Sequence, residues 1–447
     1  MLHITDYYAL KQHDEPVFAS ERQIPLDFGI AKNCKGKLRL LSLFSGCGGM
    51  DIGFEGGFIA PRKSFAPESN CVDYLIDEDW LCLKPNKFTT VFANDILPEA
   101  KAGWNAYMST HGHDDDIYNL MSIVDLVKMH RAGANVFPQN IDVVTGGFPC
   151  QDFSVAGKRK GFNSTKDHEG NMRTDDVPTE ESRGKLYYWM KQVIDIVHPK
   201  VFIAENVKGL VSLGNVKEII QKDFASADGN GYIVLNPQIL NAADYGVPES
   251  RERVIFIGIR RDALTKKALD ALTSDNITDE YNPYPRITHS YSVSDKVLLP
   301  VVTTSDILAS LPEPEHSYDP SQQIYSKAKY LSHGQGQTEI KPNNVGPTIR
   351  SEHHGNIEFR RLSLEHGGTH IDELQAGLQE RRLTVRECAL IQSFPPDYPF
   401  IIKREMNRGY LLSSSGAYKV IGNAVPPILA YHIARRLQDV WPLYFEQ

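Results

Sequence analysis

Two short fragments of the sequence contain residue types that could act together on one aromatic ring. Cys150 follows a Gly-Phe-Pro turn that comes directly after the apolar stretch 141–145. Glu205 and Asn206 follow a second apolar stretch, 201–204. A thiolate is a reactive nucleophile near neutral pH, and a carboxyl group whose pKa is raised by burial can donate a proton. A nucleophile and a proton donor that converge on one ring are what methylation of cytosine at carbon 5 requires.

The chemistry explains why both residue types are needed. Carbon 5 of cytosine is a poor nucleophile, so a thiolate must first add to C6, and C5 can then attack the sulfonium methyl of S-adenosylmethionine. A carboxylic acid at N3 relieves the negative charge that this addition places on the ring. Each residue also has an inert interpretation when taken alone, because Cys150 could be a buried thiol and Glu205 a capping or ion-paired carboxylate.

Six motifs, in order along residues 38–438, resemble those of the DNA (cytosine-5) methyltransferases of the prokaryotic restriction-modification type. They are residues 43–49, 147–154, 205–207, 245–253, 382–388 and 422–426. Six ordered matches are far more specific than any one of them. The resemblance implies S-adenosylmethionine as methyl donor, no metal, double-stranded DNA as substrate and a cognate restriction endonuclease as functional partner.

The resemblance also adds three residues to the base site, beside the nucleophile and the acid. Asn206 adjoins the acid, and Arg253 contacts the O2 atom of the cytosine. Arg251 supports the loop or a phosphate, although a structural ion pair with Glu249 or Glu252 remains a serious alternative.

A glycine-rich turn at residues 44–49 follows the first predicted strand, and glycines let the backbone approach a ligand closely. Alone, such a turn could equally bind a dinucleotide or a phosphate. Asp95, after the second strand, is placed to accept hydrogen bonds from ribose hydroxyls. By resemblance Phe44 stacks on adenine and Asp125 binds its exocyclic amine, although Asp125 could also be an ordinary surface carboxylate. The predicted cofactor site is Phe44, Gly46, Gly48, Gly49, Asp95, Asp125, Phe148, Pro149, Leu186 and Asn423.

DNA contacts are expected in two places. A stacked cytosine must swing out of the duplex to be modified, and the polar loop beyond Cys150 should then close over the DNA. Residues 346–350 resemble the family's recognition motif, and residues 351–360 resemble members that read short GG/CC-type palindromes. The predicted DNA-binding residues are Gln151, Ser154, Lys158, Arg159, Thr348 and Arg350.

Composition is ordinary for a globular protein: 447 residues, 41% hydrophobic and 23% charged. The formal net charge of −8 is unusual for a protein that binds phosphates, so we expect local clusters of Lys and Arg to line the DNA cleft. Six cysteines without a Cys-x-x-Cys pair, no signal peptide and no membrane-length apolar run predict a soluble protein of the reducing cytoplasm. We expect it to be a monomer.

Apolar stretches at 38–44, 90–92, 141–145, 201–204 and 254–259 alternate with helical segments such as 100–108 and 186–197. This pattern predicts an α/β fold with a mostly parallel, Rossmann-like methyltransferase sheet. The expected parts are an N-terminal extension (1–37), a catalytic and cofactor-binding domain (38–261), a smaller loop-rich target-recognition domain (262–380) and a segment returning to the catalytic domain (381–447).

Two other functions are open to this sequence. One is an RNA (tRNA) cytosine-5 methyltransferase on the same fold, although the large region 262–380 exceeds what a tRNA enzyme needs. The other is a catalytically inactive DNA-binding relative. The intact Cys150, Glu205 and glycine-rich turn argue against inactivity.

Overall fold

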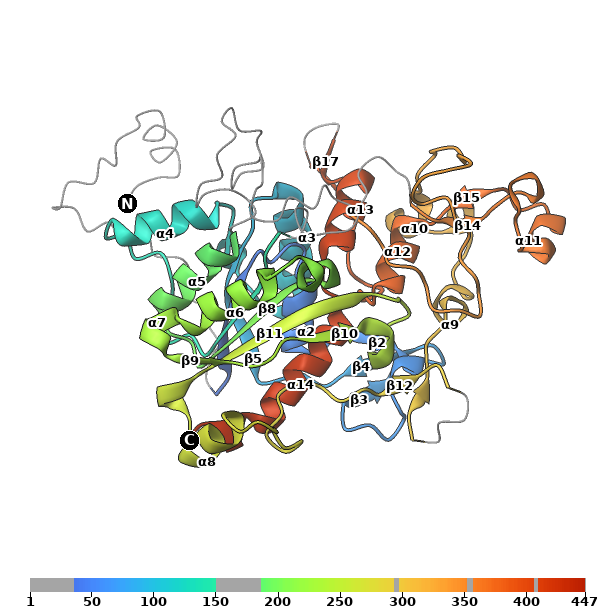
Figure 1. The fold of residues 1–447 in the computed structure, drawn as a ribbon. Helices are drawn as coiled ribbons and strands as arrows, with labels where there is room; N and C mark the ends of the chain where they lie inside the picture. Colours follow the sequence, from blue (N-terminus) through green and yellow to red (C-terminus); the bar gives the residue numbers. More distant parts are fainter. Residues whose placement is uncertain (1–35, 150–185, 293–296, 352–356, 406–408, 447) are drawn as a thin grey trace.

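The computed structural model describes residues 36–149, 186–292, 297–351, 357–405 and 409–446, and the rest of the chain is drawn in grey in Figure 1. Five residues predicted to act in catalysis or DNA binding lie outside the described residues, and their roles stay predictions. They are Cys150, Gln151, Ser154, Lys158 and Arg159.

A central sheet of eight strands organises the molecule, in the order β10-β11-β8-β7-β1-β5-β6, with β9 pairing to β11. Its strands are β1 (Leu38–Leu43), β5 (Phe88–Asn94), β6 (Tyr118–Asn119), β7 (Val143–Gly147), β8 (Val201–Val207), β9 (Tyr232–Val234), β10 (Gln238–Asn241) and β11 (Glu252–Arg260). Every residue of β5 is buried, as continuous apolar strands require when both faces of a sheet are covered. The five apolar stretches predicted as strands lie in β1, β5, β7, β8 and β11, so the predicted fold class is confirmed.

The sheet is parallel from β6 to β8, and only β9, β10 and β11 run antiparallel to their neighbours. From β1 the chain passes to β5 and β6 on one side, then returns to β7 and β8 on the other side of β1. Ligands of open α/β sheets bind beyond the carboxyl ends of the strands at such a reversal. The carboxyl ends of β1, β5 and β7 are therefore where a cofactor site is expected.

Helices cover both faces of the sheet (Figure 1). Buried residues of α4, α5 and α6 form one apolar core with one face, and those of α2, α3 and α14 form a second core with the other. The helices are α2 (Gly49–Glu55), α3 (Pro98–Met108), α4 (Ile123–Arg131), α5 (Leu186–Val197), α6 (Val216–Ala225), α7 (Ala227–Asn230) and α14 (Pro427–Tyr444). No helix in the described part of the chain is long and apolar enough to cross a membrane.

The C-terminal helix α14 packs directly on α2, the first helix after β1. Gly53 allows this contact, because a Cβ there would overlap Ala430 and the carbonyl oxygen of Pro427. The end of the chain thus lies beside the segment that follows the first strand.

Short elements make up residues 262–425, as the Pro-rich and polar composition predicts. They are α8 (Lys266–Leu272), β12 (His289–Ser290), β13 (Leu299–Pro300), α9 (Thr304–Leu308), α10 (Pro320–Gln323), β14 (Phe359–Arg361), α11 (Ile371–Gln375), β15 (Arg381–Arg382), α12 (Val385–Ile391), β16 (Ile402–Lys403), β17 (Tyr410–Leu412) and α13 (Ser414–Asn423). In Figure 1, β14, β15 and α11 form an arm at the upper right, with α11 at its tip. The predicted domain boundaries remain predictions.

A small antiparallel sheet, which the sequence analysis did not predict, follows α2. Its strands are β2 (Ile59–Pro61), β3 (Val72–Leu75) and β4 (Trp80–Leu83). The hydroxyl of Tyr431 on α14 donates to the carbonyl oxygens of Cys71 at 3.2 Å and Lys84 at 3.1 Å, so α14 also fixes this sheet.

Candidate active site

Glu205 lies beside the point where the chain leaves β7, three residues before Cys150. Gly147, the last residue of β7, pairs with Glu205 of β8 in parallel register. A Cβ on Gly147 would lie only 2.8 Å from Oε2 of Glu205, so glycine is what allows the carboxylate to sit there. Because Cys150 is the third residue after Gly147, the described chain that leads to it leaves the sheet next to the predicted acid.

Asn206 holds the first residues that follow β7. Its side-chain Nδ2 donates to the carbonyl oxygen of Phe148 at 3.0 Å, and its Oδ1 accepts from the backbone N–H of Val207 at 2.9 Å. Asn206 is almost fully buried, so these bonds are protected from water. The residue after the acid therefore fixes the backbone that leads to the nucleophile.

Arg253 pairs with the acid, with its Nε 2.7 Å from Oε1 of Glu205. The two residues occupy the same face because Arg253 of β11 lies opposite Val207, two residues beyond Glu205 on β8. Burial raises the pKa of Glu205 by removing water from the carboxyl group, although the charges of Arg253 and Arg251 oppose this. Glu205 thus takes up a proton more readily than an ordinary glutamate.

Arg251 is fully buried and joins three segments of the chain. Its guanidinium donates to the carbonyl oxygens of Ile349 at 2.8 Å, Gly422 at 2.6 Å and Ala424 at 2.9 Å. It also pairs with Glu249 at 3.3 Å, which is one of the alternatives open from the sequence. These contacts occupy the guanidinium inside the protein, and the supporting role of Arg251 stays a prediction.

The glycine-rich turn is tied to the end of β5. The backbone N–H of Gly46 donates to Oδ2 of Asp95 at 3.0 Å, and that of Leu97 donates to Oδ1 at 3.0 Å. Phe44 and Gly46 both have positive φ, 53° and 54°, so the chain turns sharply here. Burial raises the pKa of Asp95, and the two backbone donors oppose that rise. The half-exposed carboxylate retains lone pairs for hydroxyl donors.

Gly48 and Gly49 fill a space with no room for a side chain. A Cβ on Gly48 would lie 2.7 Å from the indole of Trp104, and one on Gly49 would overlap the carbonyl oxygen of Val425. The turn is therefore packed between α3 and the turn at 422–426, which begins beside the exposed Asn423.

The remaining predicted cofactor residues approach the same strand ends. Buried Phe148 and Leu186 belong to the apolar core against which Phe44 packs, and Pro149 is half-buried. Asp125 lies in the first turn of α4. The chain just before α4 is held at the end of β5, where Nδ2 of Asn94 donates to the carbonyl oxygen of Met121 at 2.7 Å. An apolar wall, a glycine cradle and an acceptor carboxylate fit a nucleoside cofactor.

Asp51 is a buried carboxylate beneath this turn that the sequence analysis missed. Its Oδ2 accepts the indole N–H of Trp104 at 2.7 Å, and the residue is fully buried. Burial raises its pKa to about 6, although hydrogen bonds from Ser42 and Trp104 oppose the rise. The only signal in the sequence was one acid in the otherwise apolar first turns of α2.

Predicted recognition residues lie along the segment that contains the base-site arginines. The backbone N–H of Gly346 donates to the carbonyl oxygen of Pro248 at 2.9 Å, and Oγ1 of Thr348 donates to that of Ser250 at 2.5 Å. Arg350, about a third exposed, forms an ion pair with a buried glutamate at 358. Residues 346–350 thus adjoin the base site.

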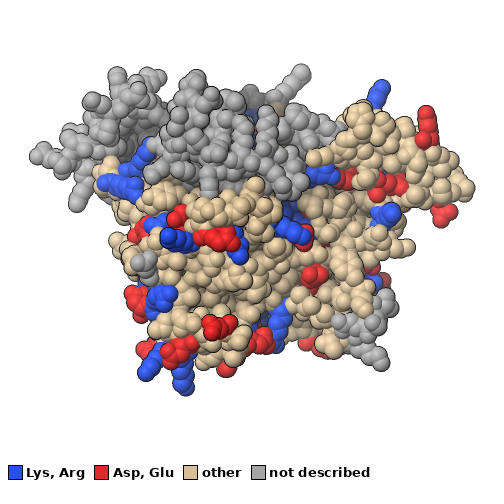
Figure 2. Space-filling model, viewed as in Figure 1, with Lys and Arg blue, Asp and Glu red and all other residues tan. Residues whose placement is uncertain are grey.

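Surface charge near these elements is mixed. Figure 2 shows Lys and Arg interspersed with Asp and Glu over the described surface of this face. The basic residues Lys158 and Arg159 lie outside the described residues. A cleft lined by positive charge therefore stays a prediction.

Comparisons with known proteins agree with this geometry. The family model C-5 cytosine-specific DNA methylase matches residues 38–439. The Type II methyltransferase M.BspRI of Lysinibacillus sphaericus is 30% identical over 416 residues, covering 90% of this chain and 81% of the relative. M.BsuRI of Bacillus subtilis, also a Type II methyltransferase, is 30% identical over 418 residues, covering 92% and 81%. The crystal structure of S. pombe Dnmt2 methyltransferase has a TM-score of 0.51 at 17% identity, covering 90% of this chain and 98% of that one, a likeness in fold alone. The chain belongs to the C-5 cytosine-specific DNA methylase family and is an S-adenosylmethionine-dependent DNA cytosine-5 methyltransferase.

Proposed function

We propose that the enzyme methylates a cytosine flipped out of a specific short sequence of double-stranded DNA, through a covalent bond between Sγ of Cys150 and C6. We further propose that it is the modification arm of a Type II restriction-modification system, protecting host DNA from a cognate endonuclease. The relatives named Type II methyltransferases support this second part.

The register of Gly147 with Glu205 is the observation that carries the mechanism. It supports a thiolate and a carboxyl group acting on opposite parts of one ring. In the proposed reaction Cys150 adds to C6 while Glu205 protonates N3, so the ring gains no net negative charge. After methyl transfer to C5, the C5 proton passes to water, the Cys150 thiolate leaves C6 and the N3 proton returns to Glu205, which restores the aromatic ring.

Arg253 and Asn206 organise this reaction. Arg253 uses its Nε on Glu205 and its Nη1 on the carbonyl oxygen of Glu252 at 2.9 Å, so we propose that its Nη2 binds the cytosine O2. Asn206 fixes the carbonyl of Phe148 and thereby limits where the following loop can place the thiol. Orientation of this kind supplies a large part of enzymatic rate enhancement.

The methyl donor would lie at the carboxyl ends of β1 and β5. S-adenosylmethionine supplies an electrophilic methyl group as a sulfonium. Phe44 would stack on its adenine, Asp95 would accept from the ribose hydroxyls, and the glycine-rich turn would allow close approach of the backbone. Asn423 would close the far side.

Bisulfite sequencing of DNA from cells that express the protein tests the proposal, since it reports reaction, position and motif together. We expect the wild-type protein to methylate cytosines of one short motif, which then resist conversion by bisulfite. Cys71→Ala, a matched change at a half-buried cysteine outside the site, should give the same pattern. Cys150→Ala should protect none while still binding duplex DNA, because only the covalent step is lost. An active Cys150→Ala, or activity on tRNA alone, would refute the proposal.

A trapped adduct gives a second measurement. In 5-fluorocytosine, fluorine replaces the C5 hydrogen that must be lost before the thiolate can leave. The enzyme should therefore remain covalently bound to such a duplex in a denaturing gel. Cys150→Ala should show no such band, and a band in that variant would move the nucleophile elsewhere.

A further inference from the structure

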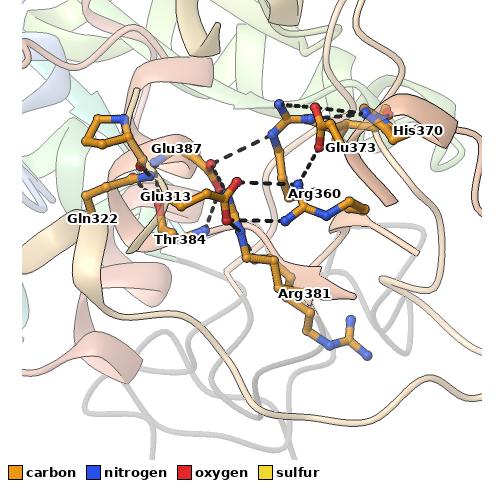
Figure 3. A network of polar contacts seen from close by, with 12 residues as sticks. Glu313, Gln322, Arg360, His370, Glu373, Arg381, Thr384 and Glu387 are labelled. Carbon is orange, nitrogen blue, oxygen red and sulfur yellow. Dashed lines mark hydrogen bonds and ion pairs between the residues drawn. The ribbon is translucent and has the colours of Figure 1, made fainter. Parts of the chain in front are cut away.

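Six charged side chains form a closed ring between the arm and α12 (Figure 3). Arginine and glutamate alternate around it, and each glutamate contacts two arginines. We refer to these residues as the charge ring. In order around the ring they are Arg381, Glu313, Arg361, Glu373, Arg360 and Glu387.

Most links of the charge ring are hydrogen-bonded. Arg381 binds Glu387 through two N–H groups at 2.8 and 2.9 Å, and binds Glu313 through two more at 2.9 and 3.2 Å. Arg361 contacts Glu313 at 3.2 and 3.3 Å, and it also pairs with Glu373. Paired N–H bonds of this kind fix relative orientation as well as distance.

Arg360 closes the ring. Its Nη2 lies 3.1 Å from Oε1 of Glu373, and its Nε lies 3.9 Å from Oε1 of Glu387, the longest link. His370 also contacts Glu373, at 3.4 Å. Of the two links between the arm and α12, Arg360–Glu387 is therefore the weaker and Arg381–Glu387 the stronger.

The charge ring joins segments that are far apart in the sequence. Arg360 and Arg361 are on β14, Glu373 is on α11, Arg381 is on β15 and Glu387 is on α12. The arm, defined as residues 357–382, supplies four of these side chains. α12 supplies Glu387, and Glu313 comes from the segment that follows α9.

α12 connects the charge ring to the catalytic domain. The side chain of Gln392, which follows α12, donates to the carbonyl oxygen of Ala424 at 2.6 Å, the same oxygen that accepts from Arg251. Shortly after, the hydroxyl of Tyr398 donates to the carbonyl oxygen of Cys47 in the glycine-rich turn at 2.8 Å. An orientation set at α12 is thus set relative to both predicted sites.

The arm also positions an exposed polar loop. Arg382, next to Arg381 on β15, is buried and donates to the carbonyl oxygens of Ala328 at 2.7 Å, Lys329 at 3.0 Å and Gly336 at 2.5 Å. The loop 327–337 that these bonds hold exposes Lys327, Lys329, Ser332, His333 and Gln335. Such side chains can contact phosphates and base edges.

We propose that the charge ring fixes the arm, and with it the loop 327–337, in one orientation against α12, so that its members are positioning residues for sequence discrimination. This inference rests on the proposed function. Buried ion pairs add little net stability compared with apolar packing, because desolvation offsets their attraction. A balanced ring of directional bonds instead selects one arrangement, and its value lies in geometry.

Glu373→Gln tests the proposal, with Asp372→Asn as the control. Glu373 orients Arg360 and Arg361, which bind Glu387 and Glu313 outside the arm, so its amide should loosen both of those links. Because Glu373 is half-buried, the fold should tolerate the change, and Asp372 is an exposed neighbour on the same helix. The substrates are duplexes with the motif found by bisulfite sequencing and duplexes with one base pair changed. We expect the ratio of kcat/KM between these two duplexes to fall about tenfold in Glu373→Gln, because a loop no longer held in one orientation discriminates less well against one wrong base pair. Asp372→Asn should keep the ratio, and KM for S-adenosylmethionine should change less than about twofold in both.

A double-mutant cycle adds a second measurement. Arg360→Gln should also lower discrimination, and the double variant Arg360→Gln with Glu373→Gln should lose less than the product of the single losses, because one link is removed twice. Multiplicative losses would contradict a shared ring.

Three results separate the possible failures. If Glu373→Gln lowers Tm but keeps full discrimination, the charge ring serves stability only and the inference is wrong. If the wild-type protein methylates no DNA cytosine, the proposed function fails instead. Hydrogen exchange then still decides whether the ring fixes the arm, since amides of residues 357–382 should exchange faster in Glu373→Gln than in Asp372→Asn, and equal exchange would reject it.

Discussion

Gly147→Ala isolates the contact on which the proposed mechanism depends. The added Cβ would lie 2.8 Å from Oε2 of Glu205, about 0.6 Å closer than ordinary contact at 3.4 Å. Gly147 does not have positive φ, so alanine is compatible with the backbone there. The carboxylate, or the loop that follows β7, must therefore move.

The displacement predicts a loss of rate with little loss of fold. Glu205 is held by Arg253 at 2.7 Å, so it moves by stretching a buried ion pair. Since a misplacement of about 1 Å can cost about a hundredfold in rate, we expect kcat to fall about ten- to a hundredfold. The assay is transfer of a labelled methyl group from S-adenosylmethionine to duplex DNA, with KM measured for both substrates. KM for S-adenosylmethionine should change little, because the glycine-rich turn is untouched.

Gly146→Ala is the matched control for this prediction. Its Cβ would also lie 2.8 Å from a neighbour, but that neighbour is the sulfur of Met190, a flexible side chain that can turn aside. We expect kcat within about threefold of wild type. Full activity in Gly147→Ala, or an equal loss in Gly146→Ala, would show that crowding of Glu205 is not what matters.

Three further predictions concern the cofactor turn and its supports. Gly49→Ala should weaken S-adenosylmethionine binding at least about tenfold by calorimetry, because a Cβ there overlaps the carbonyl of Val425. Asp51 has a pKa of about 6 against 3.8 ordinarily, so its contribution to the free energy of unfolding is complete below pH 3.8 and is lost as pH rises through 6. Asp51→Asn does not titrate and so lacks that loss. The difference in free energy of unfolding between this variant and the wild type, measured with urea, should shift by about 1 kcal/mol in favour of the variant from about pH 5 to about pH 7.5. Arg251→Lys cannot reach three carbonyls and Glu249 together, so it should raise KM for both substrates in steady-state kinetics.

Local sequence features predicted the sheet and drew attention to the carboxylate at the end of β8. Continuous apolar runs mark parallel strands wherever both faces are covered, which is why β5 and β8 were recognisable from sequence alone. Glu205 was recognisable because it interrupts such a run at its end. The role of Gly147 was not, since its lack of a side chain matters only through the carboxylate of the neighbouring strand.

Long-range polar contacts left no local pattern to recognise. Trp104 and Asp51 are 53 residues apart, and Arg381 is 68 residues from Glu313. Each of these side chains, taken alone, resembles an ordinary helix or surface residue. The sheet formed by β2, β3 and β4 was missed for a different reason, because short strands among prolines do not show sustained alternation.

Arg251 connects segments that are predicted to hold the base, to recognise DNA and to bound the cofactor site. Its guanidinium joins Ile349 of the recognition segment to Gly422 and Ala424, and the oxygen of Ala424 also accepts from Gln392. The carbonyl oxygen of Val425, the next residue, limits the space at Gly49 of the glycine-rich turn. Because one buried cation holds Ile349 and the segment next to Val425, we expect a shift of the recognition segment to be felt at the glycine-rich turn. We therefore expect Arg251 to act through geometry rather than by contact with DNA.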